Sequence, residues 1–255
     1  MKRHASHTRR QGGFTLVEIA IVLMIVGLLI GGILRGQELI QSARVRNIID
    51  QKSAIQTAYI GFMDRYRMLP GDLTANQNGT VGNGALASAP AAGGGAAGDG
   101  IITWNSEGIL FFQNLTAAGF LSCGACMTVA APQGGTANGA ANVTNSPTNV
   151  YGDFINAGLV ASVNATTGGW LDATGGLNHM ILTTGGTVPS QVLAEVDRKA
   201  DDGAAGTGQL RFFEDGGTTA NSATCAPIPA GAGANVANGA WANPSQTNCQ
   251  GSWLL

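Results

Sequence analysis

The sequence predicts an α+β protein in which one long N-terminal helix precedes a small head of antiparallel strands. An unbroken apolar run at residues 14–34 and an amphipathic helical pattern up to residue 68 predict the helix. Short apolar runs separated by Gly, Asn and Thr predict the strands of the head. We therefore divide the chain into a leader at 1–13, an apolar helix at 14–34, an amphipathic helix at 35–68 and a head at 69–255.

The composition excludes several functional classes. Only 11% of the 255 residues are charged, and 13 Lys and Arg stand against 15 Asp and Glu, which argues against a nucleic-acid-binding protein with its basic face. Three histidines leave little material for a His-based metal centre or a catalytic triad. The 39 glycines follow no three-residue period, which excludes collagen.

The run at 14–34 has the length of a transmembrane helix, because a helix of this length covers about 30 Å. Lys2, Arg3, Arg9 and Arg10 precede it, so we expect the N-terminus to stay in the cytoplasm and the head to be exported. A cleaved secretory signal peptide is the alternative. The run is too long for the apolar region of such a peptide, and no A-x-A cleavage site follows it.

Glu18 is the one ionisable residue of the apolar run. A carboxylate inside a membrane helix is costly unless it is paired, so it indicates a functional site. No later residue of the run offers a positive charge. The partner of Glu18 is therefore expected from another chain or from a nearby terminus.

Residues 9–18, which read RRQGGFTLVE, resemble the class III signal of type IV prepilins and type II secretion pseudopilins. The shared features are a basic leader, a Gly before an aromatic residue, and a Glu at the required spacing within the apolar run. The resemblance implies that prepilin peptidase cleaves between Gly13 and Phe14 and methylates the new Phe14 amine. It also implies that Glu18 of one subunit pairs with the Phe14 amine of its neighbour.

This family consists of subunits that are anchored in the inner membrane and then extracted by an assembly platform into a helical filament. The resemblance therefore implies three kinds of partner besides the lipid bilayer: other subunits, prepilin peptidase and the platform. It implies no enzymatic activity, and the charge balance of the sequence predicts no nucleic-acid partner. The resemblance also implies where the mature subunit lies. A pilin lies in an extracellular pilus, whereas a major or minor pseudopilin lies in a periplasmic pseudopilus. Many members have a Pro where this chain has Arg35.

A membrane-anchored exported enzyme or binding protein is the alternative from another class. It would need a nucleophile–base or metal constellation in a concave site. His179 is the only histidine outside the leader, and a lone histidine is more often a structural or surface residue.

Leu69 and Pro70 are expected to end the long helix, because Pro lacks a backbone donor and restricts the residue before it. The Ala-, Gly- and Asn-rich stretch at 73–100 predicts a surface loop. Its Gly93, Gly95 and Gly98 match a nucleotide-binding glycine pattern, but no strand precedes them and no suitable helix follows.

The rest of the head is predicted to contain two short helices and three strands. The helices are expected at 106–121, with Trp104 beside it, and at 190–198, with Ser190 as its cap. The strand candidates lie at 150–155, 179–184 and 208–213.

The carboxylates of Asp197, Asp201 and Asp202 lie in a Gly-rich segment, where oxygen ligands are able to hold calcium. The segment lacks the spacing and the final Glu of an EF-hand loop. We therefore favour a solvated turn between a helix and a strand, and we expect no other cofactor.

All four cysteines, Cys123, Cys126, Cys225 and Cys249, lie in the part that we expect to be exported, where disulfides persist. The C-x-x-C pair lacks the βαβ context of a redox motif and further ligands for zinc, so we expect structural bridges. Four cysteines allow three connectivities. We favour Cys123–Cys126 and Cys225–Cys249, of which the second closes a C-terminal loop as pilins often do.

Overall fold

A computed structural model gives the fold. The chain forms two compact units, Met1–Ala43 and Arg44–Leu255, which are described separately. The residues that the structure describes are 13, 15–81, 98–104, 107–127, 141–163, 169–171, 178–214, 222–227, 240–242 and 246–255. The leader residues 1–12, Phe14, and most of the Gly-rich stretch with Gly93 and Gly95 lie outside this set.

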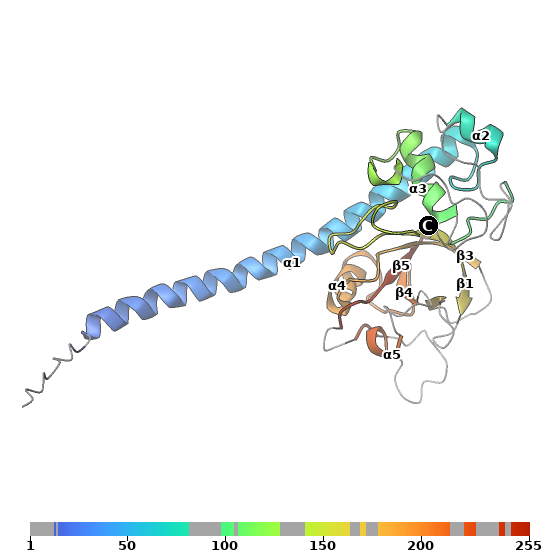
Figure 1. The fold of residues 1–255 in the computed structure, drawn as a ribbon. Coiled ribbons are helices and arrows are strands. Elements are labelled where there is room, and N and C mark those ends of the chain that lie inside the picture. The colour runs from blue at the N-terminus through green and yellow to red at the C-terminus, as the bar shows by residue number, and fades with distance from the viewer. Residues whose placement is uncertain are drawn as a thin grey trace, which may run out of the picture. The chain divides into compact units, whose positions relative to one another are not determined.

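The first element is the helix α1, Leu16–Tyr66, which carries residues of both units (Figure 1). Residues 16–34 of the helix are apolar and exposed, and the helix is long and apolar enough to cross a membrane. The helix ends where Arg67 takes a left-handed conformation with φ 56°. Its N–H still donates to the carbonyl of Met63, so the helix stops one turn before Pro70.

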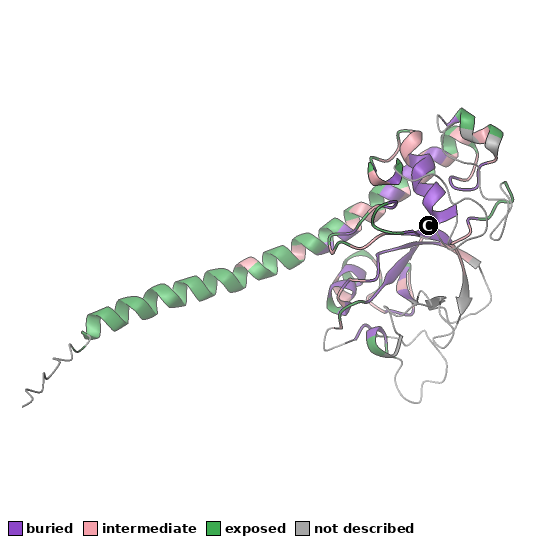
Figure 2. Ribbon diagram, viewed as in Figure 1, coloured by how far each residue is buried: buried purple, intermediate pink, exposed green. Residues whose placement is uncertain are grey.

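In the second unit α1 is amphipathic (Figure 2). One side is polar, and the other is buried in the head at helical spacing. The buried residues of α1 are Val45, Ile48, Ile55, Ala58 and Phe62. The head therefore packs on α1 from Val45 onward, as the amphipathic pattern predicts.

Two further helices follow α1 in the head. The helix α3, Glu107–Ala117, is nearly all buried and confirms the helix predicted at 106–121. The helix α2, Ala75–Thr80, corrects the prediction of a continuous loop at 73–100. Its start is fixed by the side chain of Gln77, which accepts a hydrogen bond from the N–H of Thr74 at 2.8 Å.

The sheet has four antiparallel strands in the order β1-β3-β5-β4, and the short β2 closes it into a barrel. β2 pairs in parallel with β1 and antiparallel with β4. The strands are β1 Ala157–Val163, β2 Gly169–Leu171, β3 Asn178–Thr183, β4 Leu210–Glu214 and β5 Gly251–Leu254. The α+β fold, with one long helix and a small antiparallel sheet, is the fold that the sequence predicts.

Two of the three predicted strands are confirmed, because β3 and β4 overlap the candidates at 179–184 and 208–213. The candidate at 150–155 is wrong, since these residues form a turn. There the side chain of Asn149 accepts hydrogen bonds from the N–H groups of Tyr151 and Asp153. A side chain that satisfies the backbone locally removes the need for a strand partner.

The helix α4, Ser190–Ala200, confirms the helix predicted at 190–198, but its cap is not Ser190. Pro189 occupies the cap position. The hydroxyl of the buried Ser190 instead donates to the carbonyl of Ala242 and accepts from the N–H of Gln246. The short elements η1, Ala125–Met127, and α5, Ser222–Cys225, each include one cysteine of a disulfide.

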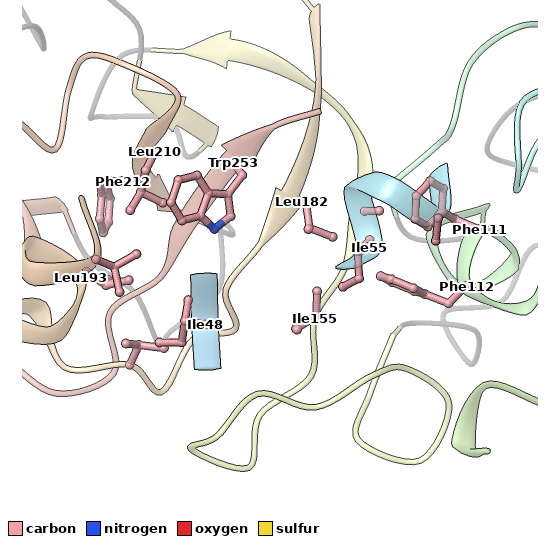
Figure 3. Packing of buried hydrophobic residues seen from close by; sticks show 14 of the residues in the cluster. Ile48, Ile55, Phe111, Phe112, Ile155, Leu182, Leu193, Leu210, Phe212 and Trp253 are labelled. Atoms are coloured by element: carbon pink, nitrogen blue, oxygen red, sulfur yellow. The ribbon is translucent and has the colours of Figure 1, made fainter. Parts of the chain in front are cut away.

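The core of the head lies around the buried face of α1 (Figure 3). Ile48 and Ile55 of α1 belong to the same buried cluster as the sheet residues Leu182 and Trp253. Phe111 and Phe112 of α3 join the cluster, and Phe111 lies 5.8 Å from the ring of Tyr59 on α1. The second half of α1 is thus a structural element of the head.

Candidate functional site

The start of α1 is built by Thr15 and Glu18. Thr15 directly precedes the helix, and Glu18 is its third residue. One carboxylate oxygen of Glu18 accepts hydrogen bonds from the N–H of Thr15 at 2.8 Å and from its hydroxyl at 2.9 Å. The Thr15 hydroxyl accepts from the N–H of Glu18 at 3.3 Å. This reciprocal arrangement is a capping box, which satisfies donors that a helix start leaves free.

Both residues of this capping box are exposed in the single chain. The hydrogen bonds that Thr15 donates to Glu18 engage the Oε2 atom, which leaves lone pairs on a carboxylate that is open to a further donor. The negative charge also lies in the first turn, where the helix dipole favours it. The capping box therefore holds a carboxylate in a fixed position at the start of an apolar helix.

The structure places two of the three residues of the predicted cleavage and assembly site. Gly13 is exposed and has no atom within 4 Å of a Cβ added to it, while Glu18 lies in the capping box. Phe14 lies outside the described residues, so its predicted cleavage, methylation and pairing with Glu18 stay predictions. Thr15 is the residue that the sequence analysis missed. The spacing T-x-x-E at the start of an apolar run is the sequence pattern from which its capping role could have been predicted.

The glycines of the apolar half of α1 have no packing role within the chain. A Cβ added at Gly27, Gly31, Gly32 or Gly36 would meet nothing within 4 Å. Gly61, in the second half, differs because its Cβ would lie 3.0 Å from the ring of Phe120. Arg35, at the position where many members of the resembled family have Pro, forms an exposed ion pair with Glu38 at 2.6 Å.

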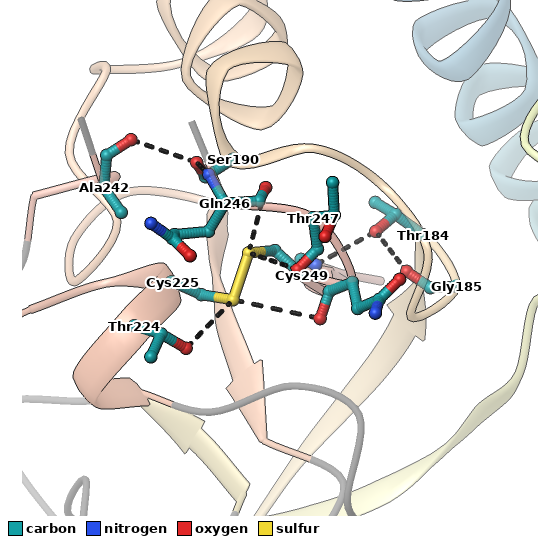
Figure 4. Close-up of a disulfide and its surroundings, with 11 residues drawn as sticks. Thr184, Gly185, Ser190, Thr224, Cys225, Ala242, Gln246, Thr247 and Cys249 are labelled. Carbon is teal, nitrogen blue, oxygen red and sulfur yellow. Dashed lines mark hydrogen bonds between the residues drawn. A yellow bond between two sulfur atoms is a disulfide. The ribbon is translucent and has the colours of Figure 1, made fainter. Parts of the chain in front are cut away.

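The four cysteines form two disulfides, Cys123–Cys126 and Cys225–Cys249, with Cα atoms 5.4 and 5.6 Å apart. Both are the pairs that the sequence analysis favours. Figure 4 shows the second disulfide beside Thr184 and Gln246. Cys249 is also bonded through its backbone to Val188, so this disulfide ties the segment before β5 to α5 and to the loop before α4.

The structure brings the predicted calcium candidates together at the end of α4. One carboxylate oxygen from each of Asp197, Asp201 and Asp202 lies within 4.8 Å of the others. Each carboxylate also accepts hydrogen bonds from the loop between α4 and β4. These donors are the N–H groups of Gly203, Ala204, Gln209 and Leu210 and the hydroxyl of Thr207. The three acids therefore organise the turn between a helix and a strand.

Asp197 is the buried member of this acidic cluster. Its carboxylate accepts a hydrogen bond from the indole N–H of Trp241 at 2.7 Å. Burial raises the pKa of Asp197 to about 6, although the bonds from Trp241 and Gly203 act in the opposite direction. The Trp241 bond also anchors residues 240–242 on the end of α4.

His179 and two pockets among the described residues of the head bear on the alternative of an exported enzyme. His179 lies half-buried on β3. A pocket beside Lys52, Asn149 and Trp253 has a volume of about 10 Å³, which is room for a single water molecule. A shallow hollow near the end of α1, lined by Ile60, Met63, Asp64 and Arg67, contains no nucleophile paired with a base.

Comparison with known families identifies the N-terminal segment. Residues 8–34 match the prokaryotic N-terminal methylation motif, which is the prepilin-type cleavage and methylation signature. No curated protein and no solved structure matches the chain. The motif supports a protein of the type IV pilin or pseudopilin family, a class of generally non-enzymatic structural subunits. It also fits anchoring in the inner membrane by the apolar half of α1.

Proposed function

We propose that this chain is the structural subunit of a type IV pilus-like filament. Prepilin peptidase removes residues 1–13 and methylates Phe14, and the apolar half of α1 then holds the subunit in the inner membrane. An assembly platform extracts the subunit, and its α1 packs against the same helix of other subunits. The head is exported, and the filament ends outside the cell.

The observation that carries this proposal is that the methylation motif coincides with an apolar segment of α1 that is fully exposed. Every described residue of α1 from Leu16 to Leu34 is exposed within the chain. So much apolar surface requires lipid or other helices as its surroundings. Glu18 is held by Thr15 in this exposed surface, ready to accept the Phe14 amine of a neighbouring subunit.

A type II secretion pseudopilin, major or minor, is the second candidate, because the same motif serves both systems. In that case the filament stays in the periplasm and drives protein export. Imaging of surface filaments in a strain that lacks this chain separates the two candidates, since only loss of surface filaments supports the pilus.

Mass spectrometry of the mature N-terminus tests the class. We expect a chain that begins with N-methylated Phe14. The variant Gly13→Lys should remain uncleaved, because it places a long charged side chain at the scissile bond, whereas Gly12→Ala should be processed. An intact Met1, or an N-terminus near residue 35 or later, would refute the class.

The variant Glu18→Gln tests assembly. It preserves the shape and capping capacity of the side chain but removes the charge that a neighbour's amine would meet. In cells that produce only this variant of the chain, we expect normal processing, normal membrane insertion and loss of filaments. Filaments that form at the wild-type level would contradict the proposed charge pair.

We further propose that the acidic cluster of Asp197, Asp201 and Asp202 organises a turn and holds no resident ion. The reason is that backbone and hydroxyl donors already engage each of the three carboxylates. We expect the melting temperature to be the same with calcium and with a chelator. A calcium-dependent rise that disappears in Asp201→Asn and Asp202→Asn would establish a calcium site instead.

A further inference from the structure

A hydrogen-bonded turn lies at the surface of the head at residues 149–153. The buried Asn149 side chain holds it from inside, since its Oδ1 accepts from the N–H of Tyr151 at 2.8 Å and of Asp153 at 3.1 Å. Its Nδ2 donates to the carbonyl of Thr184 at 2.6 Å. Gly152 closes the turn with φ 83°. The apex at Val150 and Tyr151 is therefore presented by a fixed backbone.

The apex combines an apolar, an aromatic and a basic side chain. Val150 is 39% exposed, although it is a large apolar residue. The guanidinium carbon of the exposed Arg44 lies 5.2 Å from the centre of the Tyr151 ring, in a cation–π arrangement. The acid of the turn, Asp153, accepts from the N–H groups of Phe154 and Gly186, which binds its carboxylate to the backbone.

The turn lies at the end of the head where the chain enters it. The side chain of Gln51 on α1 donates to the carbonyl of Thr148. Tyr151 lies against Arg44, which precedes Gln51 on α1 by nearly two helical turns. Arg44 is the first residue of the second unit. In the sequence Arg44 follows the apolar run, which ends at Leu34, by ten positions.

We propose that Arg44, Val150 and Tyr151 form a membrane-contact surface that docks on the headgroups of anionic phospholipids while the subunit waits in the bilayer. This inference rests on the proposed membrane anchoring. Tyrosine and exposed apolar residues suit the membrane–water interface, and basic residues near it are attracted to anionic lipid. The exposed Arg46 adds positive charge at the same end, whereas residues 68–197 contain no Lys or Arg.

Photo-crosslinking of the full chain in lipid nanodiscs tests the proposal. A diazirine side chain replaces Val150 in one sample and Ile60 in the other, because Ile60 is also exposed, at 58%, but lies farther along α1. We expect phospholipid adducts at position 150 in discs that contain phosphatidylglycerol and none at position 60. Absence of lipid adducts at 150, or equal yields at both positions, would overturn the proposal.

Charge variants provide the second arm. Arg44→Gln should lower the adduct yield at position 150 about fivefold, the effect of one basic residue near an anionic surface. Arg65→Gln is the matched control, since Arg65 also lies 5.2 Å from a tyrosine ring, that of Tyr66, about twenty residues further along α1. Equal losses in both variants would refute the role of Arg44.

Discs that hold two copies distinguish lipid from a second subunit. Protein–protein adducts at position 150 in place of lipid adducts would overturn the proposal and assign the turn to subunit packing. Mass spectrometry of the N-terminus in the same samples tests the proposed function separately. A correctly processed chain without lipid adducts at 150 refutes only the membrane-contact surface.

Discussion

The two halves of α1 belong to one helix but are stabilised in different ways. From Leu16 to Ala43 its large apolar side chains are exposed, and a Cβ added at any of four glycines would meet nothing within 4 Å. From Arg44 to Tyr66 the apolar side chains are buried in the head, and Gly61 lies against the ring of Phe120. Within the chain, burial in the head therefore stabilises only the second half, and the capping box lies at the start of the first half.

The largest expected effect comes from truncating side chains in the two halves. Phe62→Ala removes a fully buried ring from the core and should destabilise the head by about 3–5 kcal/mol. Leu28→Ala removes a side chain that is 72% exposed and should leave the head's stability unchanged. Urea unfolding in detergent micelles, followed by tryptophan fluorescence, measures both. Similar losses in the two variants would contradict the difference between the halves.

Removing the disulfides should weaken the head and leave the first half of α1 unaffected. The Cys225–Cys249 bond spans 24 residues, and its removal by a double Ser substitution should cost about 3 kcal/mol. The same change at Cys123 and Cys126, which span 3 residues, should cost about 2 kcal/mol. Thermal unfolding ranks the two variants, and circular dichroism in micelles checks the helix. A reversed ranking would refute the loop-length argument.

The stability of the head should vary with pH through the carboxyl group of Asp197. Its pKa is raised to about 6, so the folded state retains a proton that the unfolded state has already released. The contribution of Asp197 to stability is therefore fully present below about pH 4 and is lost as the pH rises to 6, by up to about 3 kcal/mol. Asp197→Asn should abolish this fall in a chelator-containing buffer, whereas Asp202→Asn should retain it. A fall that persists in Asp197→Asn would exclude Asp197 as its source.

The smallest effect is expected at the start of α1. Thr15→Ala removes the hydroxyl of the capping box and should destabilise the first turn by about 1 kcal/mol. Amide hydrogen exchange of residues 16–19 in micelles measures this loss. Thr57→Ala is the control, because the Thr57 hydroxyl donates to a carbonyl four residues earlier within the helix. Equal exchange in Thr15→Ala and wild type would show that lipid alone fixes the helix start.

The sequence predicts the parts of the fold that depend on long periodic patterns. The apolar run and the amphipathic stripe predict α1 to within two residues at each end. The same approach misses β1 and β5, because the small residues of Ala157–Val163 and the short Gly251–Leu254 have weak strand patterns. These strands form through partners distant in the chain, which a local pattern does not contain.

The candidate site divides in the same way. The positions of Gly13, Phe14 and Glu18 follow from a local motif within the matched residues 8–34, and their roles stay predictions. The role of Thr15 is also local and was readable from its spacing to Glu18. The bond between Asp197 and Trp241 joins residues 44 positions apart. Only the fold brings such a pair together, so no reading of either segment alone predicts the raised pKa.

The place of β5 in the sheet determines when the head is able to fold. β5 lies between β3 and β4, although it follows both in the chain. If the head crosses the membrane from its N-terminal end, β3 and β4 arrive before β5, the strand that pairs with both of them. Pairing over such separations is slow, and unpaired strand edges invite aggregation. On the proposed export, the sheet would therefore be complete only once β5, which follows the other four strands in the chain, has crossed the membrane.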